Sequence, residues 1–266
     1  MESDEAAYKR RITGLYDRAA PTYGQVGPPF FQHVGRRLVE LAGVSPGARV
    51  LDVATGRGAV LFAAAEATGH GGHVLGIDLA ERMVAETSAE IGRRGLAHAA
   101  VRVMDAEQLD LPDAAFDAVL CSFAIFLFPS PQRCLLECRR VLRPGGVVGL
   151  GAADPVDPRW DWENELFRRH APGLELPPAM RGRSLRRPGE LVRELEAAGY
   201  ADAREVREEA SFAFRDADEW WDGLWTHGTR LPLESMSDEA RARFETEGRA
   251  QIKELAATGG WPGGST

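Results

Sequence analysis

The segment at residues 49–58, which reads RVLDVATGRG, constrains the fold of this chain more than any other stretch. A short apolar run with one acidic residue stops at a Gly-x-Gly turn, and a helix-compatible segment at 59–68 follows at once. This order is typical of the first strand, turn and helix of a nucleotide-type α/β sheet. The glycines let a ligand approach the backbone, with a helix N-terminus behind them. The segment therefore predicts a ligand site but does not show which ligand is bound.

Beyond this turn the sequence alternates between strand patterns and helix patterns. Strands are predicted at 73–78, 100–104, 116–121 and 147–152, and helices at 81–94 and 131–141. Strands and helices that alternate at this spacing form βαβ units with right-handed crossovers. We therefore expect an α/β fold with a mostly parallel sheet.

The two ends of the chain follow other patterns. Helices are predicted at 5–18 and 30–43, ahead of the first strand. After residue 153 a segment rich in proline and aromatic residues reads as an insertion over the edge of the sheet. Beyond it the patterns predict a helix at 188–198, a strand at 200–214 and helical structure at 216–257. The predicted divisions are a helical lid at 1–47, a core at 48–153, an insertion at 154–187 and a C-terminal part with a helical cap at 188–266.

Charge and cysteine content limit the classes of function. The 266 residues carry 32 basic and 40 acidic side chains, a net charge of −8, which argues against a nucleic-acid surface. The three cysteines, at 121, 134 and 138, have no partners at metal-ligand spacing, so we expect free thiols and no metal. The acidic amino terminus is unlike a signal peptide, and no apolar run reaches membrane-spanning length. We expect a cytoplasmic protein without membrane insertion; exchange of the first helix would allow a homodimer.

The acidic residues at the strand ends favour one kind of ligand. A dinucleotide site would carry a third glycine where this chain has Leu61, and the carboxylate of Asp52 would repel a pyrophosphate. The same carboxylate suits a ligand with an ammonium group. Asp78 ends the second strand, where a carboxylate accepts hydrogen bonds from a ribose diol. Asp105 follows the third strand, where it either accepts from an adenine amino group or caps a turn.

Five motifs in order carry a resemblance to a known family. They are LDVATGRG at 51–58, GIDL at 76–79, DAEQL at 105–109, FDAV at 116–119 and RVLRPGG at 140–146. Together they resemble class I S-adenosylmethionine-dependent methyltransferases. The likeness is to the branch that includes the ubiquinone and menaquinone biosynthesis methyltransferases and small-molecule methyltransferases of natural-product pathways. The resemblance covers residues 48–150, with looser likeness on either side.

The resemblance implies a Rossmann-like three-layer sandwich with six or seven strands, an N-terminal helical lid and helical insertions. A seventh, antiparallel strand is usual in the family, yet no β-branched run after Glu254 provides it. The implied cofactor is S-adenosylmethionine, with S-adenosylhomocysteine as product. The residues implied to bind it are Tyr23 from the lid, Asp52, Ala54, Gly56, Gly58, Asp78, Leu79, Met83, Asp105, Ala106, Ser122 and Phe123.

Methyl transfer is an in-line displacement, so the protein must align the reacting atoms and exclude water. A base is needed only for a poor nucleophile, and the candidates are His33, His170 and His227, with Tyr16 and Tyr23 as hydrogen-bond partners. The acceptor is expected to be a small apolar or aromatic molecule. Its pocket is predicted to include Tyr16, Phe126, Trp160, Trp162 and His227, whereas Trp220, Trp221 and Trp225 have the helical spacing of core residues.

Three other functions stay open at this point. The chain could bind S-adenosylmethionine and cyclise or rearrange its substrate without methyl transfer, because alignment and exclusion of water serve both reactions. It could be an NAD-dependent oxidoreductase, since Asp78 also suits a dinucleotide ribose. A silent binding module is the last alternative.

Overall fold

The computed structural model describes residues 4–152, 160–172, 185, 187–257 and 264–265. The chain forms two compact units. The first, here called the sheet unit, comprises residues 1–21, 31–153 and 177–206. The second, here called the helical unit, comprises residues 22–30, 154–176 and 207–266.

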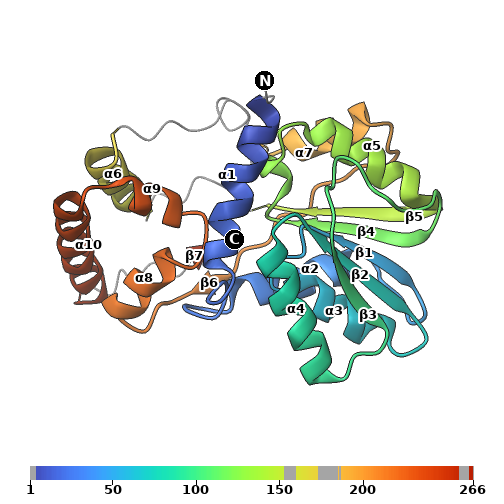
Figure 1. The fold of residues 1–266 in the computed structure, drawn as a ribbon, viewed down its shortest axis with the longest axis horizontal. Helices are drawn as coiled ribbons and strands as arrows, with labels where there is room; N and C mark the ends of the chain where they lie inside the picture. The colour runs from blue at the N-terminus through green and yellow to red at the C-terminus, as the bar shows by residue number, and fades with distance from the viewer. Residues whose placement is uncertain (1–3, 153–159, 173–184, 186, 258–263, 266) are drawn as a thin grey trace. The chain divides into compact units, whose positions relative to one another are not determined.

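The sheet unit is built on five parallel strands in the order β3-β2-β1-β4-β5, which Figure 1 shows side by side. Their bounds are β1 Arg49–Val53, β2 His73–Asp78, β3 Ala99–Val103, β4 Phe116–Ser122 and β5 Leu142–Gly151. Val53 of β1 lies opposite Ile77 of β2 and Cys121 of β4. The strand order reverses at β1, because β2 lies on one side of it and β4 on the other. Ligands of open α/β sheets bind at the carboxyl edge of such a switch point.

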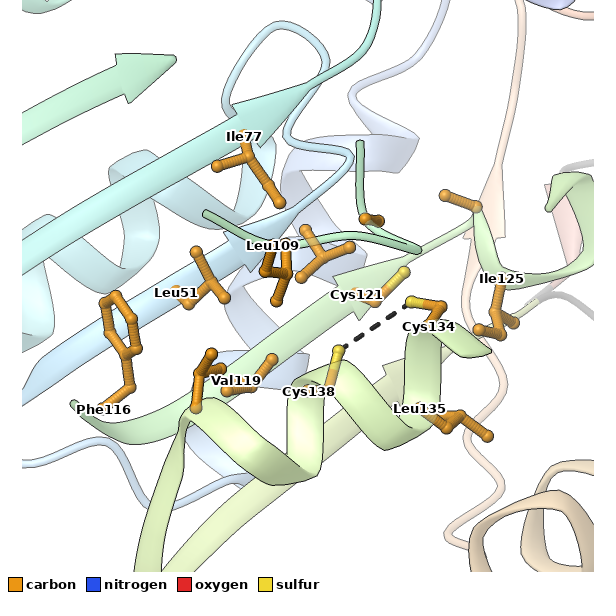
Figure 2. Packing of buried hydrophobic residues seen from close by; sticks show 14 of the residues in the cluster. Leu51, Ile77, Leu109, Phe116, Val119, Cys121, Ile125, Cys134, Leu135 and Cys138 are labelled. Carbon is orange, nitrogen blue, oxygen red and sulfur yellow. Dashed lines mark hydrogen bonds between the residues drawn. The ribbon is translucent and has the colours of Figure 1, made fainter. Parts of the chain in front are cut away.

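Helices cover both faces of this sheet, so its central strands are apolar on both sides. The helices of the sheet unit are α1 Asp4–Ala19, α2 Phe30–Leu41, α3 Ala59–Thr68, α4 Glu81–Arg94, α5 Pro131–Val141 and α7 Glu190–Ala197, with the short turn η1 at Ile125–Leu127. One core lies between the strands and α2 and α3, and contains Val50, Leu61 and Val74. The other includes side chains of α5 and α7 and is drawn in part in Figure 2.

The three cysteines are buried free thiols in this second core, as the sequence predicts. Cys134 and Cys138 lie one turn apart on α5 with their Sγ atoms 3.8 Å apart, beside Cys121 of β4 (Figure 2). Burial raises the pKa of Cys121 well above its ordinary value, and the hydrogen bond with Cys138 together with burial does the same for Cys134. These side chains therefore act as small apolar groups at neutral pH.

The helical unit has an aromatic core. Its helices are α6 Asp161–His170, α8 Ala217–Leu224, α9 Arg230–Ser235 and α10 Asp238–Ala257, and the short strand β6 Ser211–Phe212 pairs antiparallel with β7 Gly264–Ser265. Trp220 is 1% exposed and stacks on Phe244, with ring centroids 6.2 Å apart. Among the described residues, no helix is both long enough and apolar enough to cross a membrane.

Most predicted elements of the sheet unit are confirmed, and so is the helical structure predicted at 216–257, but two expectations are wrong. Within the described part of the chain the parallel sheet has five strands, not six or seven. Only residues 211–212 of the predicted strand at 200–214 are extended and paired, because the charged side chains at 204–209 are largely exposed and form no apolar face. The helical structure predicted at 216–257 consists of the three helices α8, α9 and α10. The second break precedes α10, where Ser237 Oγ accepts a hydrogen bond from the Ala240 N–H as a cap does.

Replacing Gly248 by alanine should destabilise the helical unit. A β-carbon on this α10 glycine would lie 2.1 Å from Cη2 of Trp220, whose ring is fully packed. Overpacking of this kind costs about 1–3 kcal/mol of unfolding free energy. All six tryptophans of the sequence fall within the ranges of the helical unit, so urea unfolding followed by tryptophan fluorescence measures this unit.

The matched control is Gly92→Ala in α4, where nothing lies within 4 Å of an added β-carbon. Alanine is the better helix former, so this variant should unfold at the same or a slightly higher urea concentration when followed by circular dichroism. An unchanged fluorescence midpoint for Gly248→Ala would contradict the packing of Trp220 against α10.

Candidate active site

The backbone is strained at the carboxyl ends of two neighbouring strands. Ala54, directly after β1, has φ 54°, and Phe123, directly after β4, has φ 56°. A non-glycine residue in this region costs on the order of 1–2 kcal/mol and persists only where its surroundings hold it. The Phe123 N–H donates to the Gly151 carbonyl at 2.8 Å, which fixes one of the two turns. Strain at adjacent strand ends makes the switch point the candidate functional site.

Asp52 is a carboxylate buried inside the sheet. Asp52 is 1% exposed, and its Oδ2 accepts a hydrogen bond from Thr55 Oγ1 at 2.6 Å. Gly76 of β2 makes room for this pair, since a β-carbon there would lie 2.8 Å from Thr55 Oγ1. Burial raises the pKa of Asp52 to about 7, and the charge of Asp78 adds to the rise, although hydrogen bonds from Thr55 and Leu61 oppose it. A nearby ligand cation would stabilise the charged form of this group.

Asp78 fastens the glycine turn to the start of α4. Its Oδ2 accepts a hydrogen bond from the Gly56 N–H and its Oδ1 one from the Ala80 N–H, each at 2.9 Å. Burial raises the pKa of Asp78 above its ordinary value despite these bonds. Each carboxylate oxygen has a second lone pair, so Asp78 can still accept hydrogen bonds from a ligand.

The two glycines of the turn, Gly56 and Gly58, adopt backbone conformations that other residues disfavour. Gly56 has φ 51° and Gly58 has φ 80°, and both values favour glycine. A β-carbon on Gly58 would lie 2.7 Å from the Phe62 ring. Thr87 Oγ1 donates to the Gly56 carbonyl at 2.7 Å and so holds the turn against α4.

The third acidic residue, Asp105, is half-exposed after β3. Its Oδ1 accepts a hydrogen bond from the Glu107 N–H at 3.0 Å, which is the turn-capping role considered from the sequence. Its Oδ2 accepts a hydrogen bond from Lys9 Nζ at 2.7 Å. The capping bond uses only one lone pair, so it does not compete with binding of an adenine amino group.

The other predicted cofactor residues of the sheet unit also follow the strand ends. Met83 is 1% exposed and Ala106 is 8% exposed, whereas Leu79 is half-buried. The Oγ atom of Ser122 is buried without a hydrogen-bond partner in the part of the chain that the structure describes. The Phe123 ring packs edge-on against Phe31 of α2, with centroids 5.8 Å apart. The buried hydroxyl of Ser122 is a polar group that a ligand could satisfy.

Helix α1 is fastened to the loops that follow four of the strands. Near its start, the Tyr8 hydroxyl donates to the Leu127 carbonyl after β4 at 2.8 Å, and Lys9 reaches Asp105 after β3. The sequence patterns predict the helix but none of these contacts. A lysine among many charged residues gives no local signal of a partner 96 positions away.

The far end of α1 is held in the same way. The Asp17 carboxylate accepts a hydrogen bond from the Arg82 N–H at 2.9 Å and so caps α4, whose own N-cap residue, Ala80, offers no side-chain bond. Arg57, the middle residue of the Gly-x-Gly turn, donates to the Ala20 carbonyl at 2.5 Å. These loops follow β2 and β1, so α1 runs across the carboxyl edge of the sheet.

Two further predicted residues of the sheet unit differ in their surroundings. Tyr16 of α1 is half-buried, and burial together with the charge of Asp78 raises its pKa, so the hydroxyl stays protonated. Phe126 packs at the margin of the core that contains α5. Of the three histidines considered as bases, only His33 belongs to this unit, and it is exposed on α2.

The remaining predicted residues lie in the helical unit: Tyr23, Trp160, Trp162, His170 and His227. His170 Nε2 lies 3.1 Å from Glu247 Oε1, and its ring packs edge-on against Phe244. Burial lowers the pKa of His227 to about 4, and its Nδ1 lies 3.1 Å from Thr229 Oγ1. Sequence reasoning missed Glu163, whose Oε2 accepts a hydrogen bond from Trp220 Nε1 at 2.7 Å and whose pKa burial raises to about 7.

No group of three or more His, Cys, Asp and Glu side chains with the arrangement of a metal site occurs among the residues that the structure describes.

Comparison with known proteins agrees with this geometry. The family described as "Methyltransferase domain" matches residues 51–150. The nocamycin O-methyltransferase of Saccharothrix syringae is 35% identical over an alignment of 245 residues that covers 88% of this chain and 88% of that protein. The aklanonic acid methyltransferase DauC of Streptomyces sp. strain C5 is 35% identical over 212 residues, 76% of this chain and 96% of that protein.

Solved structures share the fold at lower identity. A SAM-dependent methyltransferase from Aquifex aeolicus is 20% identical, with a TM-score of 0.50 over 79% of this chain and 94% of that one. The [4+2]-cyclase SpnF is 22% identical, with a TM-score of 0.51 over 85% of this chain and 75% of that one. The fold alone therefore does not decide between methyl transfer and cyclisation.

The relatives that match over most of their length do decide the class. This chain belongs to the family of S-adenosylmethionine-dependent methyltransferases, as its ordered motifs predict. It is accordingly an enzyme of methyl transfer, and neither the cyclase nor the NAD-dependent alternative is favoured.

In the ligand-free protein, the buried Asp52 carboxylate should lower the free energy of unfolding in a pH-dependent way, and replacing Asp52 by asparagine should remove this effect. The folded pKa of about 7 lies above the ordinary value of 3.8, so the folded state binds this proton more tightly than the unfolded chain does. Ionisation of Asp52 therefore does not lower the free energy of unfolding below about pH 4. As the pH rises to about 7, it lowers this free energy progressively, by up to about 4 kcal/mol. Relative to the natural protein, Asp52→Asn should gain unfolding free energy between about pH 5 and pH 8, measured by urea unfolding with circular dichroism.

The control is Asp110→Asn, because Asp110 is exposed. Its unfolding free energy should follow that of the natural protein across the same pH range. A constant difference between Asp52→Asn and the natural protein would show that Asp52 is not buried as described.

Proposed function

We propose that this enzyme transfers the methyl group of S-adenosylmethionine to an oxygen, nitrogen or carbon atom of a small, apolar or aromatic molecule of the natural-product type. The observation that carries the proposal is the set of carboxylates at the switch point, Asp52 and Asp78, beside the glycine turn. The names of the two relatives, a nocamycin O-methyltransferase and an aklanonic acid methyltransferase, support the acceptor class.

The residues present fit this cofactor. Buried Asp52 would face the ammonium group, and Asp78 would accept hydrogen bonds from the ribose hydroxyls. The glycines of the turn carry no side chain that would keep a ligand from the backbone. The unsatisfied Ser122 hydroxyl suits the polar methionine end. The residues assigned to the adenine ring are Leu79, Met83, Asp105 and Ala106. Ala54 and Phe123 turn the backbone at the strand ends. Tyr23 is assigned to the lid.

The cofactor supplies an activated methyl group when it is bound. The tasks of this chain are to hold the acceptor in line with that group and to keep water out. Tyr16 and Phe126 of the sheet unit, with Trp160, Trp162 and His227 of the helical unit, are the residues assigned to the acceptor. Trp162 supports this assignment, because its indole N–H is buried and has no partner among the described residues.

A proton acceptor is required only if the acceptor atom is a poor nucleophile. His170 is the first candidate, because the Glu247 carboxylate, whose Oε1 lies 3.1 Å from His170 Nε2, would orient the ring. His33 is exposed and His227 has a pKa of about 4, so both suit this task less well. Tyr23 would act as a hydrogen-bond partner. The expectations of a cytoplasmic, metal-independent enzyme and of a homodimer stay predictions.

The proposal is tested by supplying S-adenosylmethionine with a panel of aromatic and polyketide-like acceptors. We expect a product one methyl heavier, together with one equivalent of S-adenosylhomocysteine. Asp78→Ala should weaken S-adenosylmethionine binding about 10- to 100-fold in calorimetry, because hydrogen bonds to a charged group contribute about 1.5–3 kcal/mol.

Asp110→Ala is the matched control, since it removes an exposed carboxylate that follows the Asp105 turn, and it should bind the cofactor normally. Rearranged product without S-adenosylhomocysteine would overturn methyl transfer in favour of a non-methylating reaction. Unchanged cofactor affinity in Asp78→Ala would show that the cofactor binds elsewhere.

A further inference from the structure

Lys9 of α1 lies at the centre of a group of carboxylates on the adenine side of the proposed cofactor site. Its Nζ atom is 2.7 Å from Asp105 Oδ2 and 3.5 Å from Glu5 Oε1, and it also pairs with Glu107. The Lys9 side chain is 19% exposed and that of Glu107 only 3%. An ammonium group has three protons to donate, so these carboxylates account for its hydrogen-bonding capacity.

Lys9 supplies one of the two positive charges that offset the carboxylates of this group. Glu5, Asp105 and Glu107 supply three negative charges, and Lys9 and Arg133 supply two positive ones. Burial lowers the pKa of Lys9, but its bonds to Asp105 and Glu107 raise it further, so the net shift is upward and Lys9 stays charged. Without Lys9, three carboxylates would face a single cation, and Asp105 would rotate away from its neighbours.

Asp105 depends on Lys9 for its orientation. The side chain is 34% exposed, and besides the turn bond from the Glu107 N–H its described hydrogen-bond partner is Lys9. With both oxygens held, the carboxylate has a fixed direction and a free lone pair on each oxygen. A fixed acceptor binds a ligand amino group more tightly than a mobile one, because less side-chain entropy is lost on binding.

We propose that Lys9 is a positioning residue for the cofactor: by holding Asp105 from α1, it makes that carboxylate the acceptor for the adenine amino group. This inference rests on the proposed function, since it assigns a role within the same site. It also gives α1 a part in recognising the base.

The test compares two ligands in the full-length protein. One is S-adenosylhomocysteine, and the other is its deamino analogue, in which hydrogen replaces the adenine amino group. The natural protein should bind S-adenosylhomocysteine about tenfold or more tightly than the analogue in calorimetry, as expected for a hydrogen bond to a charged group. In Lys9→Met this ratio should fall to about twofold or less, chiefly through weaker binding of S-adenosylhomocysteine, and Lys9→Arg should restore most of it.

Arg133→Met is the matched control. Arg133 contacts Glu5 and Glu107 in the same group, but it makes no hydrogen bond to Asp105 among the described residues. Its removal should leave the ratio of the two affinities unchanged. If Lys9→Met does not fold, because the buried Glu107 carboxylate loses its nearest cation, Lys9→Met combined with Glu107→Gln removes that charge and should show the same fall in the ratio.

Each other outcome overturns the inference. If Lys9→Met weakens the binding of both ligands equally, Lys9 only fastens α1. If Lys9→Met binds the two ligands more tightly, Lys9 occupies the place of the base. If the natural protein binds both ligands equally, Asp105 does not recognise the amino group, and the proposed function still stands. A natural protein that binds neither ligand would overturn the proposed function as well.

Discussion

The hydrogen bond from the Gly56 N–H to the Asp78 carboxylate is the interaction on which the site depends. It joins the turn after β1 to the residue that ends β2, while the other oxygen of Asp78 holds the N–H of Ala80 at the start of α4. A single carboxylate therefore sets the spacing between two strand ends, a turn and a helix. The left-handed conformation of Ala54 lies in the same segment, so its strain is offset by bonds that need that conformation.

Helix α1 adds long-range contacts to this local arrangement. Its side chains Asp17, Lys9 and Tyr8 contact the segments after β2, β3 and β4, and Arg57 after β1 donates to the carbonyl of Ala20, the residue that follows the helix. Each contact joins positions at least 37 residues apart in the sequence. Loops held at several points lose less entropy when a ligand binds, so α1 preorganises the carboxyl edge of the sheet. Arg57 has two functions here, since its backbone shapes the glycine turn and its side chain holds α1.

The sequence predicted the parts of the fold that depend on local patterns. The bounds of β1, β2, α3, α4 and α5 agree with the structure residue for residue, because apolar periodicity, proline and glycine mark their ends. The strand at 200–214 was wrong, because alternation among charged residues carries no information about burial. The carboxylates at the strand ends were found from their position after apolar runs. Lys9, Asp17 and Glu163 were not found, because their partners are distant in sequence and a charged residue gives no local sign of the group it meets.

The family model and the helical unit cover different parts of the chain. The matched family segment, 51–150, lies entirely within the sheet unit, where the carboxylates and the glycine turn are found. The helical unit lies outside that segment and places polar groups, Glu163 and the Trp162 indole N–H, within an aromatic core. A buried polar group in apolar surroundings destabilises the fold unless it is satisfied, so its retention needs a reason. Glu163 is satisfied by the Trp220 indole N–H, and the proposed role of Trp162 in binding the acceptor supplies a reason for its own indole N–H.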